Sequence, residues 1–257
     1  MESRRYSALV LVLFLSLFPA LTGHAEIIID LTHPFNARTI YWPTAGGFEL
    51  KKVFWGLTKK GYYQASNLFS APEHGGTHMD APVHFSKTGH TIDQIPVNQL
   101  VGKAYVIDLR KKVGDNPDYL ISKADIEGAE KKQGILGPSS IVFFNTGWAR
   151  FWENKKKYLG TDKFGDTRNL HFPGISKEAA RYLVFKKVKG VGLDTPSLDY
   201  GPATEFWAHR IILGANIYGL ENVANLDKIT SGMKIIVAPM LIEEGTGAPV
   251  RILAITE

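Results

Sequence analysis

The sequence predicts a mixed α+β (α/β) domain in which strands outnumber helices. Apolar runs of strand length, bounded by turn residues, recur along the chain, and such runs are typical of buried strands. A few stretches between them have the apolar period and the start signals of helices. No repeat or long linker divides the chain, and its 257 residues suffice for a leader and one domain with a full core. This mixed order is typical of a layered domain.

The strand predictions rest on runs rich in β-branched and aromatic residues. They cover residues 27–31, 62–69, 105–109, 141–145, 189–193, 215–220, 234–242 and 250–255. Helices are predicted over residues 122–132, 176–188 and 204–213. The first begins with a Ser-x-x-Asp pattern at Ser122, which resembles a capping box. In the second, Ser176 can cap the helix, and Ala180, Leu183 and Val184 share one face. We expect one or two helices to cover one face of the strands.

The first 25 residues have the pattern of a secretory signal peptide. Arg4 and Arg5 precede an almost wholly apolar run over residues 8–21, and small residues end at Ala25. We expect cleavage after Ala25 and a secreted or extracytoplasmic protein. The apolar run is shorter than the roughly 20 residues of a membrane-spanning helix, so an uncleaved anchor is the less favoured alternative. Residues 26–257 then form a single catalytic domain without a stable membrane anchor.

The composition restricts both the metal chemistry and the partners. The chain has no cysteine, so any metal must be bound by nitrogen and oxygen ligands. The net charge is +5 and the pI is near 9.2. The basic residues are spread in small groups, which is typical of a solvated surface. No basic stripe interleaved with aromatic residues indicates a nucleic-acid partner.

The segment from residue 74 to residue 84 concentrates metal-ligand side chains. His74, His78, Asp80 and His84 lie within eleven residues, although the chain has only eight histidines. Imidazole and carboxylate are ligands for zinc, manganese and iron. His78 and Asp80 are two residues apart, so an extended chain places both on one face. Pro82 indicates a loop or an edge strand. The pattern predicts a metal-dependent active site; surface histidines in a turn are the alternative.

A second group of ligands is predicted from the C-terminal third of the chain. Asp80 has two oxygens and can bridge two cations, and a second cation would need its own ligands. His209 and Glu221 are the candidates, because Glu221 ends an apparent strand. An ordinary buried histidine and an exposed carboxylate are the alternatives. Asp194 and Asp199 are interpreted as bracing their loop.

The pattern His-x-Gly-Thr-His-x-Asp-x-Pro-x-His over residues 74–84 resembles the signature of the metal-dependent cyclase family. That family includes bacterial-type kynurenine formamidase and isatin hydrolase. The similarity continues at residues 29–34, 145–148, 172–176 and 194–199, and at His209 and Glu221. It covers nearly the whole chain after the leader. The resemblance implies a swivelling β/β/α, cyclase-like architecture and a homodimer or homotetramer.

The resemblance also implies a metal arrangement. His74, His78 and Asp80 would bind one metal, and Asp80, His209 and Glu221 would bind the other. A divalent metal is expected, with two zinc ions per chain favoured and manganese as the alternative.

The remaining site predictions concern proton transfer and the substrate. The resemblance implies that His84 is the general acid/base, a role that suits an imidazole near neutrality. The alternative is that His84 is a plain metal ligand. Tyr41, Trp42 and Phe69 are predicted to form an apolar wall for an aromatic substrate, with core packing as the alternative.

These observations favour a secreted metal-dependent amidohydrolase that cleaves a carbon–nitrogen bond of a small, aromatic amide. N-formylkynurenine is the first candidate substrate, which would make the protein an arylformamidase. The second hypothesis is an isatin-type hydrolase that opens a cyclic amide with one manganese ion. The third is a secreted binding protein of the same fold without turnover.

Overall fold

The computed structural model describes residues 26–256. The predicted signal peptide, residues 1–25, lies outside the described residues and stays a prediction. Within the described part of the chain, no helix is both long enough and apolar enough to cross a membrane.

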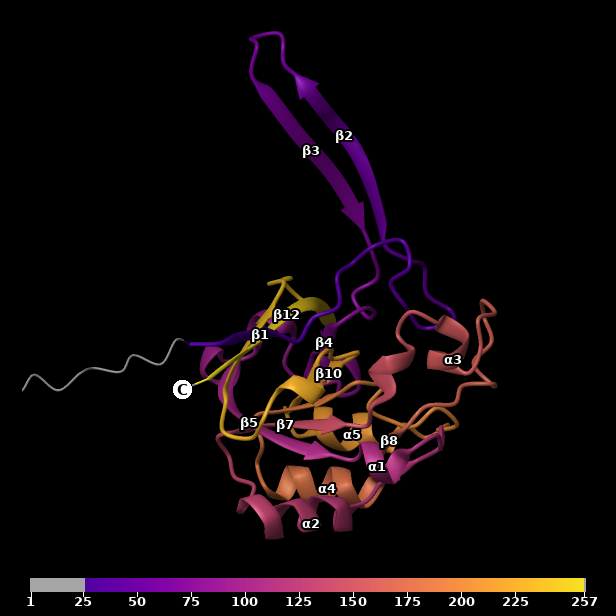
Figure 1. The fold of residues 1–257 in the computed structure, drawn as a ribbon, viewed down its shortest axis with the longest axis vertical. Coiled ribbons are helices and arrows are strands. Elements are labelled where there is room, and N and C mark those ends of the chain that lie inside the picture. Colours follow the sequence, from indigo (N-terminus) through magenta and orange to yellow (C-terminus); the bar gives the residue numbers. More distant parts are fainter. Residues whose placement is uncertain (1–25, 257) are drawn as a thin grey trace, which may run out of the picture.

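An eight-stranded sheet forms the body of the molecule (Figure 1). Its strands are β1 (Ile28–Asp30), β4 (His78–Asp80), β5 (Val101–Asp108), β7 (Ser140–Asn145), β9 (Gly190–Leu193), β10 (Tyr218–Glu221), β11 (Lys234–Pro239) and β12 (Gly247–Ile255). They follow the order β1-β12-β11-β5-β7-β9-β10-β4, and β4 also pairs with β12. The sheet therefore closes on itself and resembles a barrel. This strand-rich α+β architecture confirms the predicted fold class.

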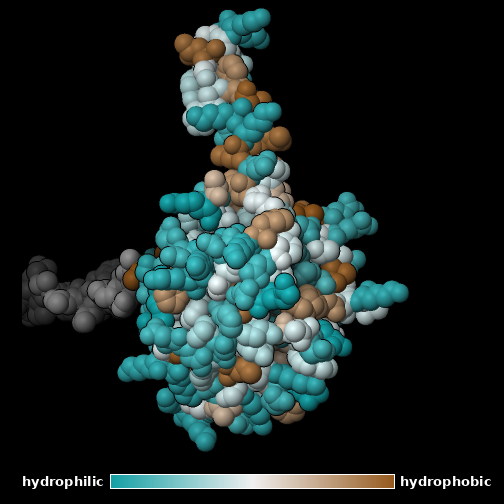
Figure 2. Space-filling view, turned by 90° about the vertical axis from the view of Figure 1, so that its right-hand side faces the viewer, coloured by the Kyte–Doolittle hydropathy of each residue, from teal (hydrophilic) through white to brown (hydrophobic). Residues whose placement is uncertain are grey.

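A long hairpin projects from this body as an arm (Figure 1). It consists of β2 (Glu49–Leu57) and β3 (Tyr63–Ser70), which pair only with each other. Brown, hydrophobic side chains are visible along its surface in Figure 2. The sequence predicted β3 but not β2, because lysines and exposed positions interrupt the apolar pattern of β2.

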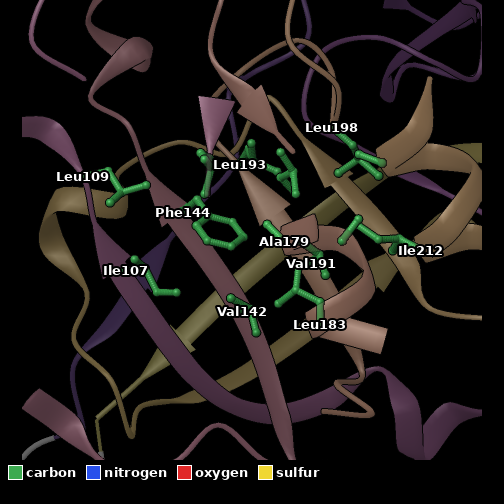
Figure 3. Packing of buried hydrophobic residues seen from close by; sticks show 14 of the residues in the cluster. Ile107, Leu109, Val142, Phe144, Ala179, Leu183, Val191, Leu193, Leu198 and Ile212 are labelled. Atoms are coloured by element: carbon green, nitrogen blue, oxygen red, sulfur yellow. The ribbon is translucent and has the colours of Figure 1, made fainter. Parts of the chain in front are cut away.

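Strands β5, β7, β9 and β10 run parallel and lie at the centre of the sheet. All six residues of β7 are buried, as expected for a parallel strand that is covered on both faces. Its side chains alternate, so that Ile141 and Phe143 belong to one core cluster and Val142 and Phe144 to another. Figure 3 shows the second cluster, where Val142, Phe144 and Val191 meet side chains such as Leu183 and Ile212.

Helices cover one face of the parallel strands, as predicted. The longer ones are α2 (Lys123–Gln133), α4 (Lys177–Phe185) and α5 (Trp207–Gly214). Both predicted caps are present: the Ser122 and Ser176 hydroxyls each accept a backbone hydrogen bond of 3.2 Å, from Asp125 and Ala179. Helix α4 ends before residue 188 because Lys187 adopts a left-handed backbone conformation, with φ of 55°.

The other elements are short. They are α1 (Arg110–Val113), α3 (Lys155–Leu159), β6 (Leu120–Ile121) and β8 (Gly174–Ile175), with 3₁₀ turns at Pro82–His84, Ile92–Gln94, Val97–Gln99, Trp148–Phe151 and Leu226–Lys228.

The position of β4 corrects the prediction that Pro82 confines this segment to a loop or an edge strand. Strand β4 pairs with β10 on one side and with β12 on the other. Pro82 lies just beyond the strand, at the start of a 3₁₀ turn, so its missing N–H removes no bond from the ladder. The metal-ligand motif is therefore held inside the closed sheet.

Candidate metal centre

Closure of the sheet assembles the candidate site from segments that are distant in sequence. Strand β4 carries His78 and Asp80, and its neighbour β10 ends at Glu221, directly opposite His78 in the register. His209 lies on α5, and His74 lies on the loop that leads into β4. Two groups of candidate ligand atoms result, in each of which all atoms lie within 4.8 Å of one another. These groups are His74, His78 and Asp80, and Asp80, His209 and Glu221.

Asp80 is the residue common to both groups, and its two oxygens face different imidazoles. Oδ1 lies 2.7 Å from His74 Nδ1 and 3.3 Å from His78 Nε2. Oδ2 lies 3.4 Å from His209 Nε2 and has no hydrogen-bond partner within the described structure. The second group closes through Glu221 Oε1, which is 3.2 Å from His209 Nε2. A carboxylate placed in this way can bridge two cations.

Hydrogen bonds at the outer ring nitrogens orient two of the histidines. His78 Nδ1 is 3.0 Å from the Gly76 carbonyl, which can only accept, so this nitrogen carries the proton. His209 Nδ1 lies 2.7 Å from Asp199 Oδ2. In both rings Nε2 then faces the site and presents its lone pair to a metal that displaces the Nε2 proton, an arrangement common for metal-bound histidines.

Asp199 does more than brace its loop. Its carboxylate also accepts the backbone N–H groups of Ala208, at 2.8 Å, and of His209, at 3.1 Å. Helix α5 has no side-chain cap at its own N-cap residue, Phe206. Asp199 therefore holds both the first turn of the helix and the ring of His209. An aspartate is a suitable acceptor at a helix N-terminus. Asp199 lies seven residues before the N-cap residue Phe206, so only the tertiary structure reveals this role.

His74 lies at the more open side of the site, with its side chain 25% exposed. Its Nε2 lies 3.0 Å from the Thr246 hydroxyl, which in turn donates to Glu73. Gly247 leaves room for the ring, because an added Cβ would lie 2.5 Å from His74 Cε1. A side chain at position 247 would displace this candidate ligand.

The electrostatics of the cluster fit a cation. Burial opposes a charge on His78, but its hydrogen bond to Asp80 and the charges of Asp80 and Glu221 outweigh burial and raise the pKa of His78 to about 9. Burial likewise opposes a charge on His209, yet the bond to Asp199 and the nearby carboxylates of Asp80 and Glu221 hold its pKa well above 6.5. Burial and the charge of Asp80 raise the pKa of Glu221. The site thus carries buried negative charge that protons or a divalent metal can compensate, and the residues present fit a metal.

A cavity of about 380 Å³ opens onto the cluster. His84 lines it and stacks on His74 with a centroid separation of 3.8 Å. Burial, more than the neighbouring charges, lowers the pKa of His84 to about 4, so its ring is neutral near pH 7. Neither ligand group includes His84, and a neutral imidazole beside the ligands can accept a proton.

The cavity wall agrees only in part with the predicted aromatic residues. Tyr41 and Trp42 line the cavity. Phe69 lies on the arm instead, where it is 51% exposed and stacks on Phe48 at 6.0 Å. Two aromatic residues of the wall were not predicted, Phe85 and Phe206. Phe85 directly follows the motif residue His84, and Phe206 lies three residues before His209. That proximity was the available signal.

Comparison with known proteins places this arrangement among metal-dependent hydrolases. The Cyclase family model matches residues 29–200. An isatin hydrolase from Roseibium aggregatum is 35% identical over 205 residues, which are 76% of each chain. A kynurenine formamidase from Bacillus thuringiensis is 28% identical over 226 residues, which are 87% of this chain and 94% of that protein.

Solved structures show the same relationship. A crystal structure of an isatin hydrolase bound to the product analogue thioisatinate has a TM-score of 0.82 and 31% identity, over 90% of this chain and 92% of that chain. Isatin hydrolase A from Ralstonia solanacearum also has a TM-score of 0.82, with 29% identity over the same shares. His209 and Glu221 lie beyond the segment that the family model matches, so their placement rests on the structure of this chain.

Proposed function

Because this chain belongs to the cyclase family, as a metal-dependent hydrolase related to isatin hydrolase and kynurenine formamidase, we propose that it opens a small, neutral, aromatic cyclic amide. The bond cleaved is the carbon–nitrogen bond of the amide, and the product carries a free carboxylate and an aromatic amine. Isatin is the first substrate to test.

The charge of the cavity wall supports this choice. Four histidines line the cavity together with the candidate ligands Asp80 and Glu221. Apart from these six residues, the lining side chains carry no ionisable group other than the Tyr41 phenol. In particular, neither lysine nor arginine lines the cavity among the described residues. N-formylkynurenine carries an α-carboxylate and an α-ammonium near pH 7, and each loses its hydration on burial. Without a charged partner that loss costs several kcal/mol, whereas a neutral bicyclic amide has no such cost.

The aromatic side chains supply the corresponding attraction. Trp42, Phe85 and Phe206 contribute apolar surface to the cavity. A volume of about 380 Å³ is within the usual range for small-molecule sites. A flat bicyclic ring can contact such walls by stacked or edge-to-face packing, which is the preferred geometry of aromatic pairs.

The metal of the isatin-type reaction is proposed to be held by His74, His78 and Asp80. Asp80, His209 and Glu221 offer ligands for a second ion, which belongs to the second candidate function below. When bound, a divalent metal polarises an amide carbonyl and lowers the pKa of a water ligand.

His84 is proposed to move the proton in this reaction. Its neutral ring lies at the cavity beside His74, so it can take a proton from the attacking water and return it to the leaving nitrogen. Asp199 keeps His209 in one tautomer, and the Gly76 carbonyl does the same for His78.

The test is a comparison of kcat/KM for isatin and for N-formylkynurenine with metal-loaded protein. We expect isatin to be favoured by at least about 100-fold, which is the order of cost of one unpaired buried charge. Preference for N-formylkynurenine would refute the argument from the cavity wall. His84→Ala is the control for catalysis: we expect a loss of about 100-fold or more in kcat with metal content unchanged. If the native chain and His84→Ala hold the same amount of metal and the native chain turns over neither substrate, the binding-protein hypothesis is favoured.

One observation keeps formamidase activity as the second candidate. The structure brings together two complete ligand groups that share Asp80, and this is the arrangement that the resemblance to the formamidase branch implies. Metal content separates the candidates: two zinc ions per chain support the formamidase arrangement, and one manganese ion supports the isatin-type arrangement. The measurement is elemental analysis of protein purified without added metal.

A further inference from the structure

His74 is the candidate ligand histidine that the protein encloses least. Its side chain is 25% exposed, compared with 3% for His78 and 6% for His209. His78 and His209 each have an outer partner that orients the ring, the Gly76 carbonyl and the Asp199 carboxylate. An exposed ligand has the greater need of such a partner, because solvent competes for its ring nitrogens.

The outer partner of His74 is a chain of two side chains. His74 Nε2 lies 3.0 Å from the Thr246 hydroxyl oxygen, and this hydroxyl is bonded to Glu73 Oε2. The same carboxylate oxygen accepts the backbone N–H of Thr246 at 3.1 Å. Glu73 precedes His74 directly, whereas Thr246 lies 172 residues after His74. The two bonds therefore join the ligand motif to the segment that enters β12.

The chemistry of these groups gives the hydrogen bonds one direction. A carboxylate can only accept, so the Thr246 hydroxyl donates its single proton to Glu73. The hydroxyl oxygen can then only accept from His74, and this places a proton on Nε2. The other ring nitrogen, Nδ1, faces the site and lies 2.7 Å from Asp80 Oδ1. A proton or a metal ion lies between Nδ1 and Oδ1, because both atoms are otherwise acceptors.

We propose that Glu73 and Thr246 are positioning residues, which fix the tautomer of His74 so that this histidine binds the first metal ion through Nδ1. His74 then differs from His78 and His209, which present Nε2 to the site. This inference rests on the metal position of the proposed function and adds two residues that are not ligands.

The backbone around Thr246 is held against the strand that carries the other ligands. The Thr246 carbonyl accepts the backbone N–H of Ala81 at 3.0 Å. The next residue, Gly247, lies opposite Asp80 in the register of β12 and β4. Although Thr246 is exposed, these bonds keep its hydroxyl at a fixed distance from the His74 ring.

The His74 ring is confined by packing as well. His84 stacks on it with a centroid separation of 3.8 Å. Gly247 lies against the ring, since an added Cβ would be 2.5 Å from Cε1. Because His84 packs on this ring, a fixed His74 also fixes the side chain that is proposed to move the proton.

Substitutions at position 246 separate the effect of the hydroxyl from that of the Glu73 charge. Thr246→Val keeps the shape and the charge but removes the hydroxyl, and Thr246→Ser restores it. The mature chain is titrated with zinc in a calorimeter, and the first position is the one that Glu221→Gln leaves unchanged. We expect the zinc dissociation constant at this position to rise about 10–100-fold in Thr246→Val and less than threefold in Thr246→Ser.

Glu73→Gln tests the direction of the hydrogen bonds. An amide can donate to the Thr246 oxygen, and the hydroxyl is then free to donate to His74 Nε2, which moves the ring proton to Nδ1. We expect the zinc dissociation constant to rise by about tenfold or more. Glu243→Gln is the matched control, because Glu243 is an exposed glutamate just before Thr246 that does not line the cavity. Its expected effect is below threefold.

A spectroscopic measurement reports the tautomer without turnover. In zinc-loaded protein labelled with nitrogen-15 histidine, we expect an imidazole Nε2–H that exchanges slowly with solvent and shows a nuclear Overhauser effect to the Thr246 methyl group. This proton should exchange faster in Thr246→Val and remain slow in Glu243→Gln. A residue that only stabilised the fold would not move this signal.

Several results would overturn this inference alone. They are wild-type zinc affinity in both Thr246→Val and Glu73→Gln, an equal loss of affinity in Glu243→Gln, or a His74 ring that carries its proton on Nδ1 in the zinc-loaded protein. Failure of Thr246→Ser to keep the affinity would overturn it too, because the hydroxyl would not be the group that matters. A wild-type chain that binds neither zinc nor manganese would overturn the proposed function, and this inference with it.

Discussion

The replacement Asp199→Asn tests whether the carboxylate behind His209 controls metal binding. The substitution preserves size but removes the negative charge that accepts from His209 Nδ1 and from two backbone N–H groups at the start of α5. An amide at this position has one acceptor oxygen, and its NH₂ group faces donors. His209 then loses the partner that fixes its tautomer.

The expected magnitude follows from the bonds that Asp199 makes to the His209 ring and to two backbone N–H groups. A hydrogen bond to a charged group contributes about 1.5–3 kcal/mol, and loss of a helix N-terminal acceptor costs about 1 kcal/mol. We therefore expect the free energy of unfolding of the metal-free protein to fall by about 2–4 kcal/mol. Loss of an outer partner of a ligand histidine lowers metal affinity by about 10–100-fold.

The assay combines urea denaturation of metal-free protein with calorimetric titration of the metal. Asp194→Asn is the matched control, because Asp194 is equally buried on the same segment but accepts from Thr146 and Ala149 rather than from a candidate ligand. We expect Asp194→Asn to lower stability and to change metal affinity by less than about threefold. A folded Asp199→Asn variant with wild-type metal affinity would refute the reasoning, and so would an equal loss of affinity in the control.

Three further predictions follow from the site and its surroundings. Asp80→Asn should weaken metal binding at both positions and abolish activity, whereas Glu221→Gln should weaken binding only at the second metal position. If the Asp80→Asn variant still binds two metal ions per chain in a calorimetric titration, Asp80 does not bridge them. Burial lowers the pKa of His33 from 6.5 to about 4, so its contribution to stability is complete above pH 6.5 and is lost as the pH falls toward 4. His33→Phe should therefore reduce the loss of unfolding free energy between pH 7 and 4 by about 2–3 kcal/mol, and an unchanged pH dependence in urea denaturation would disprove this. Trp42→Ala should raise KM for an aromatic substrate by about tenfold, while Phe69→Ala should leave KM within threefold. Steady-state kinetics that reverse this order would return Phe69 to the substrate wall.

The sequence by itself determined the local features of this protein. Buried strands such as β7, and the caps of α2 and α4, follow from periodicity and from single hydroxyl side chains, which act within a few residues. The ligand motif was equally visible, because three histidines and an aspartate within eleven residues already indicate metal chemistry.

Only the tertiary structure decided how those features meet. The pairing of β4 with β10 and β12 closes the sheet and brings Glu221 opposite His78, although the two residues are distant in sequence. The contact of Asp199 with His209 and the aromatic wall at Phe206 likewise depend on tertiary packing. Phe69 is exposed because β2 and β3 pair only with each other. Periodicity gives the face of each strand, but the neighbour of each strand depends on burial and hydrogen bonding summed over the whole sheet.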